Sequence, residues 1–320
     1  MRLRCVILLC TLALAAGAAP AQFFPTKPIR LVLGSLAGGG IDIVGRILAL
    51  KLSENLGQQV IVDNRGGANG IIGMELVAKA APDGYTIFMG TAGHLSVNPA
   101  LYPKLPFNID RDFTPLAQVV SLSFLLYLHP SVSAKTLGDL IAYAKANPGK
   151  LTWSSSGVGG LPQLTGFLLN LATGMNTRNI PYKGSAPAFN DLLGGQVQYC
   201  IDAVPLGLQY VKAGRLVALA TTGHARLPFL PDVPALNETV PGLEVLNWYG
   251  MALPAGTPRE LVSRLHSEIL KAMNNPETHA KLVAQGTDPV GSTPKEFATF
   301  RKSEEVRWAR VIKEANIRAE

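Results

Sequence analysis

The spacing of hydrophobic and polar residues changes period within the first unit of the chain. Ile29–Leu33 is an apolar run of strand length, and from Asp42 to Leu56 apolar positions recur with helical spacing. Gly57 supplies the left-handed residue that commonly ends a helix. The glycine-rich turn at residues 34–40 would leave backbone N–H groups unpaired at the positive end of the helix dipole. This arrangement favours a bound phosphate or carboxylate.

Strand-like and helix-like segments continue to alternate after this unit. Residues 59–63 and 85–89 are predicted strands, and residues 71–80 are a predicted helix between them. Such an alternation with short turns predicts a parallel sheet with right-handed crossovers. Ligands of these sheets bind beyond the carboxyl ends of the strands, so we expect the turn at 34–40 to lie beside Thr91-Ala92-Gly93-His94.

A second series begins after a long apolar strand at residues 116–128. Its further elements are predicted at residues 136–146, 151–153, 163–172, 177–180, 186–193, 197–201, 206–212 and 216–220. The turn Ser154-Ser155-Ser156-Gly157-Val158-Gly159-Gly160 again joins a strand to a helix. Two donor-rich turns, one in each series, would grip an anion from both sides of a cleft. Charge-assisted hydrogen bonds of this kind contribute about 1.5–3 kcal/mol each.

The last part of the chain predicts how the two series are joined. Residues 243–253 form another long extended stretch, and two helices follow at Thr257-Pro258-Arg259-Glu260 and Thr293-Pro294-Lys295-Glu296, both with a capping-box pattern. We interpret 116–128 and 243–253 as two crossing strands that form a hinge. The prediction is an α/β fold with two domains, residues 22–122 plus 246–320 and residues 123–245, in a venus-flytrap arrangement.

Residues 1–21 have the pattern of a secretory signal peptide. A basic start at Arg2 and Arg4 precedes the apolar run Cys5–Ala16, and Ala19-Pro20-Ala21 fits a small-x-small cleavage site, with the cut after Ala21. The apolar run is shorter than the roughly 20 residues that span a bilayer. We therefore expect an exported protein that does not itself span the membrane.

Composition narrows the possible partners. Removing residues 1–21 takes away two arginines and no acidic residue, so the net charge falls from +7 to +5. Lysines and arginines are spread along the chain without forming a run, which does not indicate nucleic-acid binding. Only Cys200 remains of the three cysteines, so no internal disulfide is expected.

Motifs for catalysis, cofactors and metals are weak. The five histidines show no His-x-x-x-His pair, and no Gly-x-Ser-x-Gly elbow surrounds Ser154-Ser155-Ser156. The triplet Gly38-Gly39-Gly40 is not Gly-x-Gly-x-x-Gly, and no Gly-Lys-Ser or Gly-Lys-Thr follows it. We expect no metal, no cofactor and no enzymatic activity.

An ordered set of motifs resembles a known family. The chain is similar to the exported receptors of tripartite tricarboxylate transporters, often called Bug receptors, over essentially all of residues 22–320. The matching stretches are Phe24-Pro25-Thr26-Lys27-Pro28-Ile29-Arg30, Gly38-Gly39-Gly40-Ile41-Asp42, Asp63-Asn64-Arg65, Ala78-Lys79-Ala80-Ala81-Pro82-Asp83-Gly84-Tyr85-Thr86, Asn98-Pro99-Ala100-Leu101-Tyr102, Ser155-Ser156-Gly157, Pro181-Tyr182-Lys183-Gly184, Leu192-Leu193-Gly194-Gly195-Gln196 and Leu230-Pro231-Asp232-Val233-Pro234.

The resemblance implies a two-domain periplasmic binding protein, type II-like, that delivers an organic carboxylate to the membrane subunits of a transporter. It implies a monomer that works in the periplasm. Family members bind the carboxylate between the first-strand loop and the Ser-Ser-Gly loop. Carried onto this chain, this nominates Ser35, Leu36, Ala37, Gly38, Gly39, Thr91, Ala92, Gly93, His94, Ser155, Ser156, Gly157 and Asp202.

Some positions depart from the family pattern or allow two interpretations. Ile41 stands where threonine is usual and Val158 where asparagine is frequent, which favours a ligand with an apolar or aromatic body. Asp42 either stabilises its helix and pairs with Arg46 or contacts the anion. Asp202 is either a helix N-cap or an acceptor for a ligand hydroxyl, amine or protonated carboxyl. His94 is either a polar residue at the rim of the cleft or a ligand contact.

Three functions are compatible with this sequence. The first is a transport receptor for a di- or aromatic carboxylate, with both loops engaging the ligand. The second is a ligand-sensing periplasmic protein that acts on a signalling partner, which needs the same cleft. The third is an enzyme on a similar scaffold, for which the serine-rich turn is the sole motivation.

Overall fold

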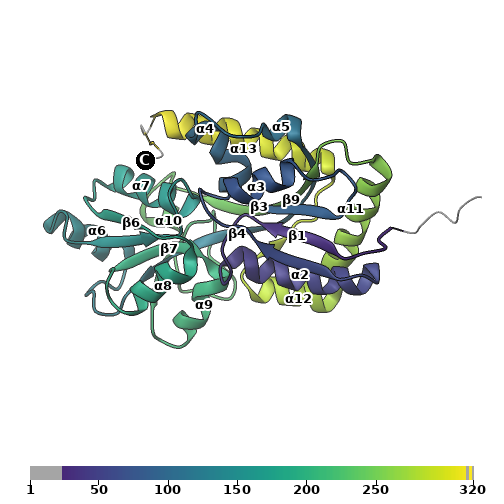
Figure 1. Cartoon of the computed structure of the whole chain (residues 1–320). Coiled ribbons are helices and arrows are strands. Elements are labelled where there is room, and N and C mark those ends of the chain that lie inside the picture. The colour runs from purple at the N-terminus through teal and green to yellow at the C-terminus, as the bar shows by residue number, and fades with distance from the viewer. Residues whose placement is uncertain (1–23, 315–316, 319–320) are drawn as a thin grey trace, which may run out of the picture.

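A single long strand, β4 (Phe113–Leu128), runs through the middle of the molecule and joins its two halves (Figure 1). The computed structural model describes residues 24–314 and 317–318, so the predicted signal peptide lies outside the described residues. The strands form one mixed sheet in the order β2-β1-β3-β9-β4-β7-β5-β6, and β8 and β10 also pair with β4. The other strands are β1 (Ile29–Leu33), β2 (Val60–Asn64), β3 (Thr86–Thr91), β5 (Thr152–Ser155), β6 (Arg178–Pro181), β7 (Tyr199–Ala203), β8 (Val217–Thr221), β9 (Leu246–Pro254) and β10 (Asp288–Pro289).

The pairing of β4 changes along its length. Residues 113–123 pair antiparallel with β9, whereas residues 124–128 pair with β7 on one side and β8 on the other. We call the part built on β1, β2, β3 and β9 the first half, and the part built on β5, β6, β7 and β8 the second half. Strands β1, β2 and β3 are parallel to one another, as are β5, β6 and β7, as the sequence predicted.

Helices cover both faces of the sheet in the first half (Figure 1). They are α2 (Gly40–Leu56), α3 (Ile71–Ala78), the π-helix η1 (Gly93–Val97), α4 (Asn98–Leu101), α5 (Ile109–Asp112), α11 (Arg259–Asn274), α12 (Pro276–Ala284) and α13 (Pro294–Glu314). Helix α2 buries Val44 and Leu48 against the sheet, and Gly57 ends it with a φ of 66°. The first unit therefore folds as its periodicity indicated.

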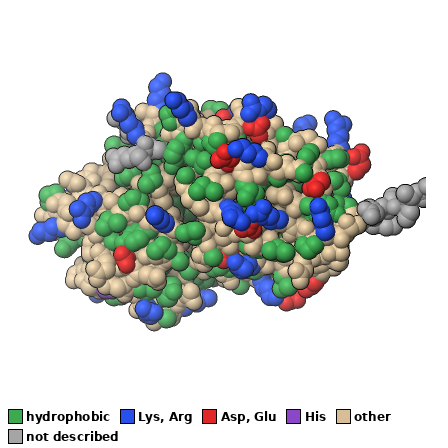
Figure 2. All heavy atoms as spheres, viewed as in Figure 1, with side chains coloured by type: hydrophobic (Ala, Val, Ile, Leu, Met, Phe, Trp, Pro, Cys, Tyr) green, Lys and Arg blue, Asp and Glu red, His purple; other side chains and the backbone are tan. Residues whose placement is uncertain are grey.

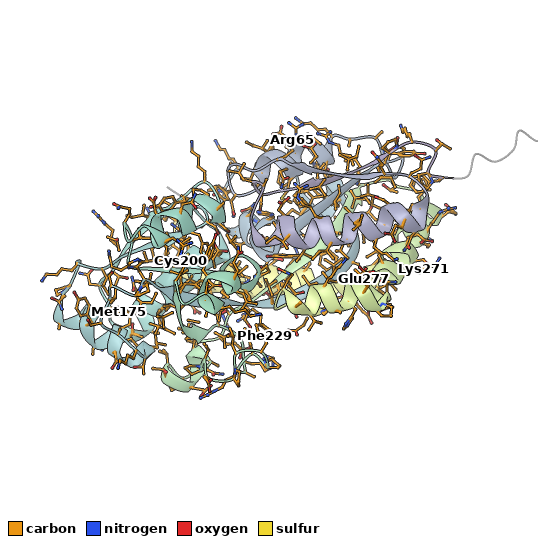
Figure 3. All side chains as sticks on the ribbon, turned by 90° about the horizontal axis from the view of Figure 1, so that it is seen from below. Arg65, Met175, Cys200, Phe229, Lys271 and Glu277 are labelled. Carbon is orange, nitrogen blue, oxygen red and sulfur yellow. The ribbon has the colours of Figure 1, made fainter. Side chains whose placement is uncertain are left out.

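The second half repeats the layered arrangement. Its helices are α6 (Leu137–Ala146), α7 (Leu161–Thr173), α8 (Ser185–Leu193), α9 (Val204–Lys212) and α10 (Leu236–Thr239). A Cβ at Gly207 would lie 2.2 Å from the ring of Tyr127, so glycine allows α9 to pack closely on β4. Cys200, labelled in Figure 3, is fully buried in this half, and burial raises the pKa of its thiol well above the usual range.

Several details near the end of the chain differ from the sequence prediction. Three long helices follow β9, not two, because Asn275 caps a further helix that has Pro276 at its first position. The capping box forms between Thr293 and Glu296, whose backbone N–H groups each bond to the other's side chain. It does not form at Thr257, whose hydroxyl donates to the carbonyl of Pro254.

Candidate functional site

The two glycine-rich turns lie at the junction of the halves. We call residues 34–40 the first loop and residues 154–160 the second loop. A Cβ at Gly40 would lie 2.9 Å from Tyr249 Oη and 3.1 Å from Ala203 Cβ, and one at Gly39 would lie 3.7 Å from Ser185 Oγ. Glycine is therefore needed where α2 begins, because the second half approaches its backbone there. Both loops therefore lie where the halves meet, the first beside Ser185 and Ala203 and the second beside Leu101 and Tyr102.

A charged cluster fixes the first loop. Asp42 Oδ2 accepts hydrogen bonds from the N–H of Gly38 (2.9 Å) and from Arg46 Nε (3.1 Å). Asn64 Nδ2 donates to Asp42 Oδ1 (3.0 Å) and to the carbonyl of Ser35 (3.2 Å). Burial alone would raise the pKa of Asp42, but the bonds from Arg46, Gly38 and Asn64 outweigh it and hold the pKa below its usual value. Asp42 thus has the structural role that its i,i+4 spacing to Arg46 indicated.

The start of α2 retains free donors. Within the described part of the chain, no hydrogen bond is made by the N–H groups of Gly39, Gly40 or Ile41, nor by those of Leu36 and Ala37. Gly38 has a φ of 83°, which turns the backbone into the helix. A 17-residue helix places partial positive charge at this end. The first loop can therefore donate to an anion without a lysine or arginine.

Neutral side chains fix the second loop. Ser155 Oγ and Asn179 are hydrogen-bonded to each other (3.2 and 3.1 Å), and Gln163 Nε2 donates to Asn179 Oδ1 (2.9 Å). Gln163 Oε1 in turn accepts from the N–H of Gly159 (2.7 Å). Ser155 has no exposed surface, and its hydroxyl supports the loop through Asn179. Among the described residues, the N–H groups of Ser156, Gly157 and Val158 remain without partners.

Two side chains of the first half reach the second loop. Asn69 Nδ2 donates to the carbonyl of Gly159 (3.1 Å) and to Asn98 Oδ1 (2.7 Å), and Asn98 Nδ2 donates back to the Asn69 carbonyl (2.9 Å). Tyr102 Oη donates to the carbonyl of Val158 (3.3 Å). Asn69 has a φ of 48°, a conformation that asparagine tolerates better than most residues. We call Asn69 and Tyr102 the clasp, since they join the halves at the second loop.

Asp202 lies at the end of β7 with one carboxylate oxygen unsatisfied. Its Oδ1 accepts from the N–H of Ala203 (2.7 Å) and from Ser185 Oγ (3.0 Å), whereas Oδ2 is buried without a partner among the described residues. Burial raises the pKa of Asp202 to about 6, against the opposing hydrogen bonds from Ala203 and Ser185. Asp202 is not the N-cap of α9, a position that Ala203 occupies.

The third predicted segment is mostly buried within the first half. Thr91 ends β3 opposite Tyr249 of β9 and is half-buried, whereas Ala92, Gly93 and His94 are buried at the start of η1. The sequence suggested a rim position or a ligand contact for His94, but its ring is only 4% exposed and its Nδ1 accepts from the N–H of Thr91 (3.2 Å). Burial lowers the pKa of His94 to about 4, so the imidazole is neutral at pH 7. Its ring packs beneath Gly34, where a Cβ would lie 2.7 Å from Nδ1.

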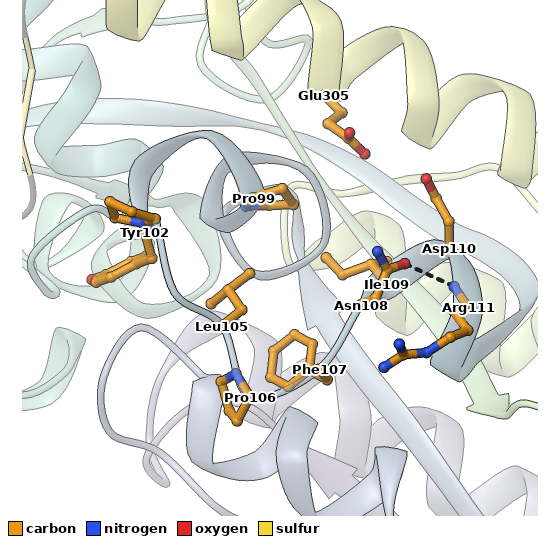
Figure 4. A pocket seen from close by; sticks show the side chains of 11 residues that line it. Pro99, Tyr102, Leu105, Pro106, Phe107, Asn108, Ile109, Asp110, Arg111 and Glu305 are labelled. Atoms are coloured by element: carbon orange, nitrogen blue, oxygen red, sulfur yellow. Dashed lines mark hydrogen bonds between the residues drawn. The ribbon is translucent and has the colours of Figure 1, made fainter.

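Two surface cavities are lined by residues outside these loops. One, of about 470 Å³, is lined by Pro99, Tyr102, Pro103, residues 105–111 and Glu305 (Figure 4). The other, of about 400 Å³, lies beside it and is bordered by Asp110, Arg301 and Lys302, which form ion pairs. Neither cavity includes a predicted ligand residue. Lysines and arginines are scattered over the face shown in Figure 2 and do not form a single patch there.

Comparison with known proteins identifies the family. The profile described as "Tripartite tricarboxylate transporter family receptor" (TctC) matches residues 44–317. The chain belongs to this receptor family. The TctC family consists of periplasmic solute-binding receptors, not enzymes, so the enzymatic alternative is excluded.

Relatives of this TctC-family chain cover nearly its whole length. It is 35% identical to protein BugT of Bordetella pertussis, over 95% of this chain and 94% of the relative. The solved structure described as "R. palustris Rpa4515 with adipate" has a TM-score of 0.90 at 34% identity and covers 92% of this chain and 99% of its own. The structure described as "MatC (Rpa3494) from Rhodopseudomonas palustris with bound malate" has a TM-score of 0.85 at 30% identity, over 90% and 100% of the two chains. These likenesses confirm the α/β periplasmic binding protein fold.

Three residues at the junction of the halves, which the sequence did not single out, are Asn69, Ser185 and Tyr249. Asn69 precedes a glycine in the turn Gly66-Gly67-Ala68-Asn69-Gly70, and an Asn-Gly step indicates a left-handed backbone. It gives no indication that the Asn69 side chain binds Gly159, which comes 90 residues later. Within residues 24–314, no helix is long and apolar enough to cross a membrane, and no three His, Cys, Asp or Glu side chains gather as metal ligands would.

Proposed function

We propose that this receptor captures an organic carboxylate between the first and second loops and delivers it to the membrane subunits of a tripartite tricarboxylate transporter. One observation carries the proposal. The free N–H groups at the start of α2 and those of Ser156, Gly157 and Val158 belong to loops that meet at the same junction of the halves. A carboxylate placed there accepts hydrogen bonds from both halves and holds them together.

The binding contacts follow from the free donors. Ser35, Leu36, Ala37, Gly38 and Gly39 form the wall on the first half, with Thr91 beside them. Four or five charge-assisted hydrogen bonds of about 1.5–3 kcal/mol each, less the cost of association, give an affinity near the micromolar range, about −8 kcal/mol. The role of four other predicted residues is indirect, because they support the loops that present these donors. These residues are Ala92, Gly93, His94 and Ser155.

The ligand class follows from the side chains and from the neighbours. Val158 places an apolar group where a polar residue is frequent in the family, and Leu36 of the first loop is 45% exposed. Ile41, which the sequence suggested as a further apolar neighbour of the ligand, is instead 3% exposed and packs in the hydrophobic core. The neighbouring structures carry adipate and malate. We therefore propose a di- or aromatic carboxylate with an apolar body, bound by a receptor that acts as a monomer.

The hinge is the pair of strands that cross between the halves. We propose domains of residues 22–122 plus 246–320 and 123–245. The change of partners within β4 between Ser123 and Phe124, and the start of β9 at Leu246, support this division. Opening would bend β4 near that point and break the hydrogen bonds of the clasp.

Calorimetry with matched ligands tests the binding. Adipate, malate, terephthalate and glutamate form the panel, and hexane-1,6-diol serves as the control because it has the length of adipate without carboxylates. We expect adipate or terephthalate to bind with micromolar affinity and the diol to give no heat. Silence of the whole panel, or equal binding of the diol, contradicts the proposal. Mass spectrometry of ligand copurified with the native protein identifies the natural ligand.

Uptake measurements test the delivery. Cells that lack the receptor and cells that lack the transporter's membrane subunits should both fail to import the labelled ligand. A transcriptional response to the ligand that persists without those subunits, together with normal uptake in cells lacking the receptor, would instead favour the signalling function.

A further inference from the structure

The buried carboxylate of Asp202 has an unusual place beside a site for anions. Asp202 is 3% exposed and Oδ2 has no hydrogen-bond partner among the described residues. Its other oxygen binds Ser185 Oγ, and a Cβ at Gly39 would lie 3.7 Å from that same hydroxyl oxygen. The carboxylate is therefore close to the start of α2, where the free N–H groups lie.

No cation offsets this carboxylate. The groups that face it are Ser156 from the second loop, Ser185 from α8, Cys200 from its own strand, Tyr127 from β4 and Tyr249 from β9. Burial raises the pKa of the Cys200 thiol and of both phenols above their usual values, so all three are neutral at pH 7. The nearest ionised group of α2, Asp42, is negative and is already paired with Arg46. No lysine, arginine or histidine of the described residues forms an ion pair with Asp202.

Two carboxylates in one dry site without a cation do not both stay ionised, because their repulsion and the loss of water favour sharing a proton. We propose that Asp202 takes up one proton from solvent when the cleft closes on a dicarboxylate, so that capture is coupled to proton uptake. The inference rests on the proposed function. In this step an O–H bond forms at Asp202 Oδ2, the proton comes from the buffer, and no other bond changes.

The geometry also determines what the protonated group does. A neutral Asp202 carries an O–H at the oxygen that is otherwise unsatisfied, and this O–H donates to a ligand carboxylate oxygen. An ionised Asp202 would instead repel it. When Asp202 is protonated, it therefore favours ligands whose carboxylates are fully ionised. As the pH rises and Asp202 loses its proton, the ligand is released. Burial raises the pKa of Asp202 to about 6 in the structure without ligand, so the carboxylate is mostly ionised there at pH 7.5.

Calorimetry of the unmodified receptor in several buffers measures the proton directly. Adipate is titrated at pH 7.5 in HEPES, imidazole and Tris, whose heats of ionisation differ, and the slope of the observed enthalpy against these heats counts protons. We expect a slope near one, and an affinity that falls close to tenfold for each pH unit between 7 and 8.5. A slope near zero with adipate bound overturns the inference and leaves the proposed function intact. Absence of binding by adipate, malate and terephthalate from pH 5 to 9 overturns both.

Two variants locate the proton. Asp202→Asn should remove the buffer dependence and flatten the pH profile. Asp191→Asn, which removes a carboxylate of the same half that Tyr182 Oη binds at 2.6 Å, should leave both unchanged. If Asp202→Asn does not fold, Ser185→Ala replaces it and should shift the pH profile upward, because Asp202 loses a bond that stabilises its ionised form. An unchanged slope in Asp202→Asn overturns the assignment to this residue.

Discussion

The first and second loops look alike in sequence and are held in different ways. Both are glycine-rich turns between a strand and a helix. The first is fixed by the ion pair of Asp42 and Arg46 together with Asn64, whereas the second is fixed by the neutral side chains of Asn179 and Gln163. Glycine content therefore specifies a turn, while the residues that hold it decide how it responds to pH and to substitution.

Each half carries a buried titratable group near the junction, and the contributions of these two groups to stability respond to acid in opposite directions. His94 packs under the first loop and is neutral at pH 7, because burial lowers its pKa to about 4. Asp202 lies at the end of β7 beside Ser185, and burial raises its pKa to about 6. Acidification therefore protonates buried His94 beneath the first loop, which destabilises the fold. It also neutralises the buried carboxylate of Asp202, which stabilises the fold.

The largest predicted effect separates these two groups by pH. The pKa of His94 lies below its unfolded value of 6.5, so the unfolded state binds more protons and stability falls between pH 6.5 and 4. The pKa of Asp202 lies above its unfolded value of 3.8, so stability rises as pH falls from 6 to 4. Each contribution amounts to about 3 kcal/mol. The free energy of unfolding is measured with urea at pH 7 and 4. Relative to the unmodified protein, His94→Asn should become more stable on acidification, and Asp202→Asn should become less stable.

The exposed His279 provides the control for this comparison, because His279→Asn should follow the unmodified protein at both pH values. If the free energies of unfolding of His94→Asn and Asp202→Asn changed with pH in the same direction, the predicted opposite responses of the two groups would be wrong.

The second effect concerns the ionised cluster of the first loop. Asp42→Asn weakens the bonds to Gly38 and Arg46 and should lower the free energy of unfolding by about 2 kcal/mol at pH 7. Because the pKa of Asp42 is held below 3.8, this contribution is present above that value and disappears as the pH falls through the folded-state pKa. Urea unfolding from pH 7 to 2.5 measures both. Glu54→Gln removes an exposed ion pair of the same helix and should change stability by less than about 0.5 kcal/mol; an equal loss would argue against the cluster.

The third effect tests the fit of the second loop against the first half. Gly159 has a φ of 74°, and a Cβ there would lie 2.3 Å from Leu101 Cδ2 across the junction. Gly159→Ala should weaken adipate binding roughly tenfold, since a left-handed alanine costs about 1–2 kcal/mol and the closed form must also shift. Gly160→Ala is the matched control, because its φ is −72° and its Cβ has room. Equal affinities for the two variants in calorimetry would contradict the proposed contact.

The smallest effect belongs to the clasp. Asn69→Gly removes the bond to the carbonyl of Gly159 while allowing the φ of 48°, and should increase adipate dissociation about fivefold, the value of one neutral hydrogen bond of about 1 kcal/mol. Tyr102→Phe should act in the same direction. Stopped-flow fluorescence measures the dissociation rate, with the exposed Tyr143→Phe as control. An unchanged rate in both clasp variants would mean that they do not stabilise the closed form.

Most of the fold could be predicted from the sequence because its signals are local. The period change before α2 and the ending at Gly57 depend on neighbouring residues. The site could be predicted only in part. The hydroxyl of Ser155, a predicted ligand residue, binds Asn179, which comes 24 residues later. The burial of His94 and the clasp of Asn69 likewise depend on distant segments, whose approach no local pattern encodes.

The path of the chain through β4 has a consequence for how the molecule assembles. The second half is one uninterrupted segment, whereas the sheet of the first half needs β9, which the chain supplies after residue 245. The strands of the second half can therefore pair before synthesis of the chain is complete. The sheet of the first half can be completed only after β9 has been made. Truncation after β8 should consequently leave an edge of β3 uncovered and the newly made chain prone to aggregation.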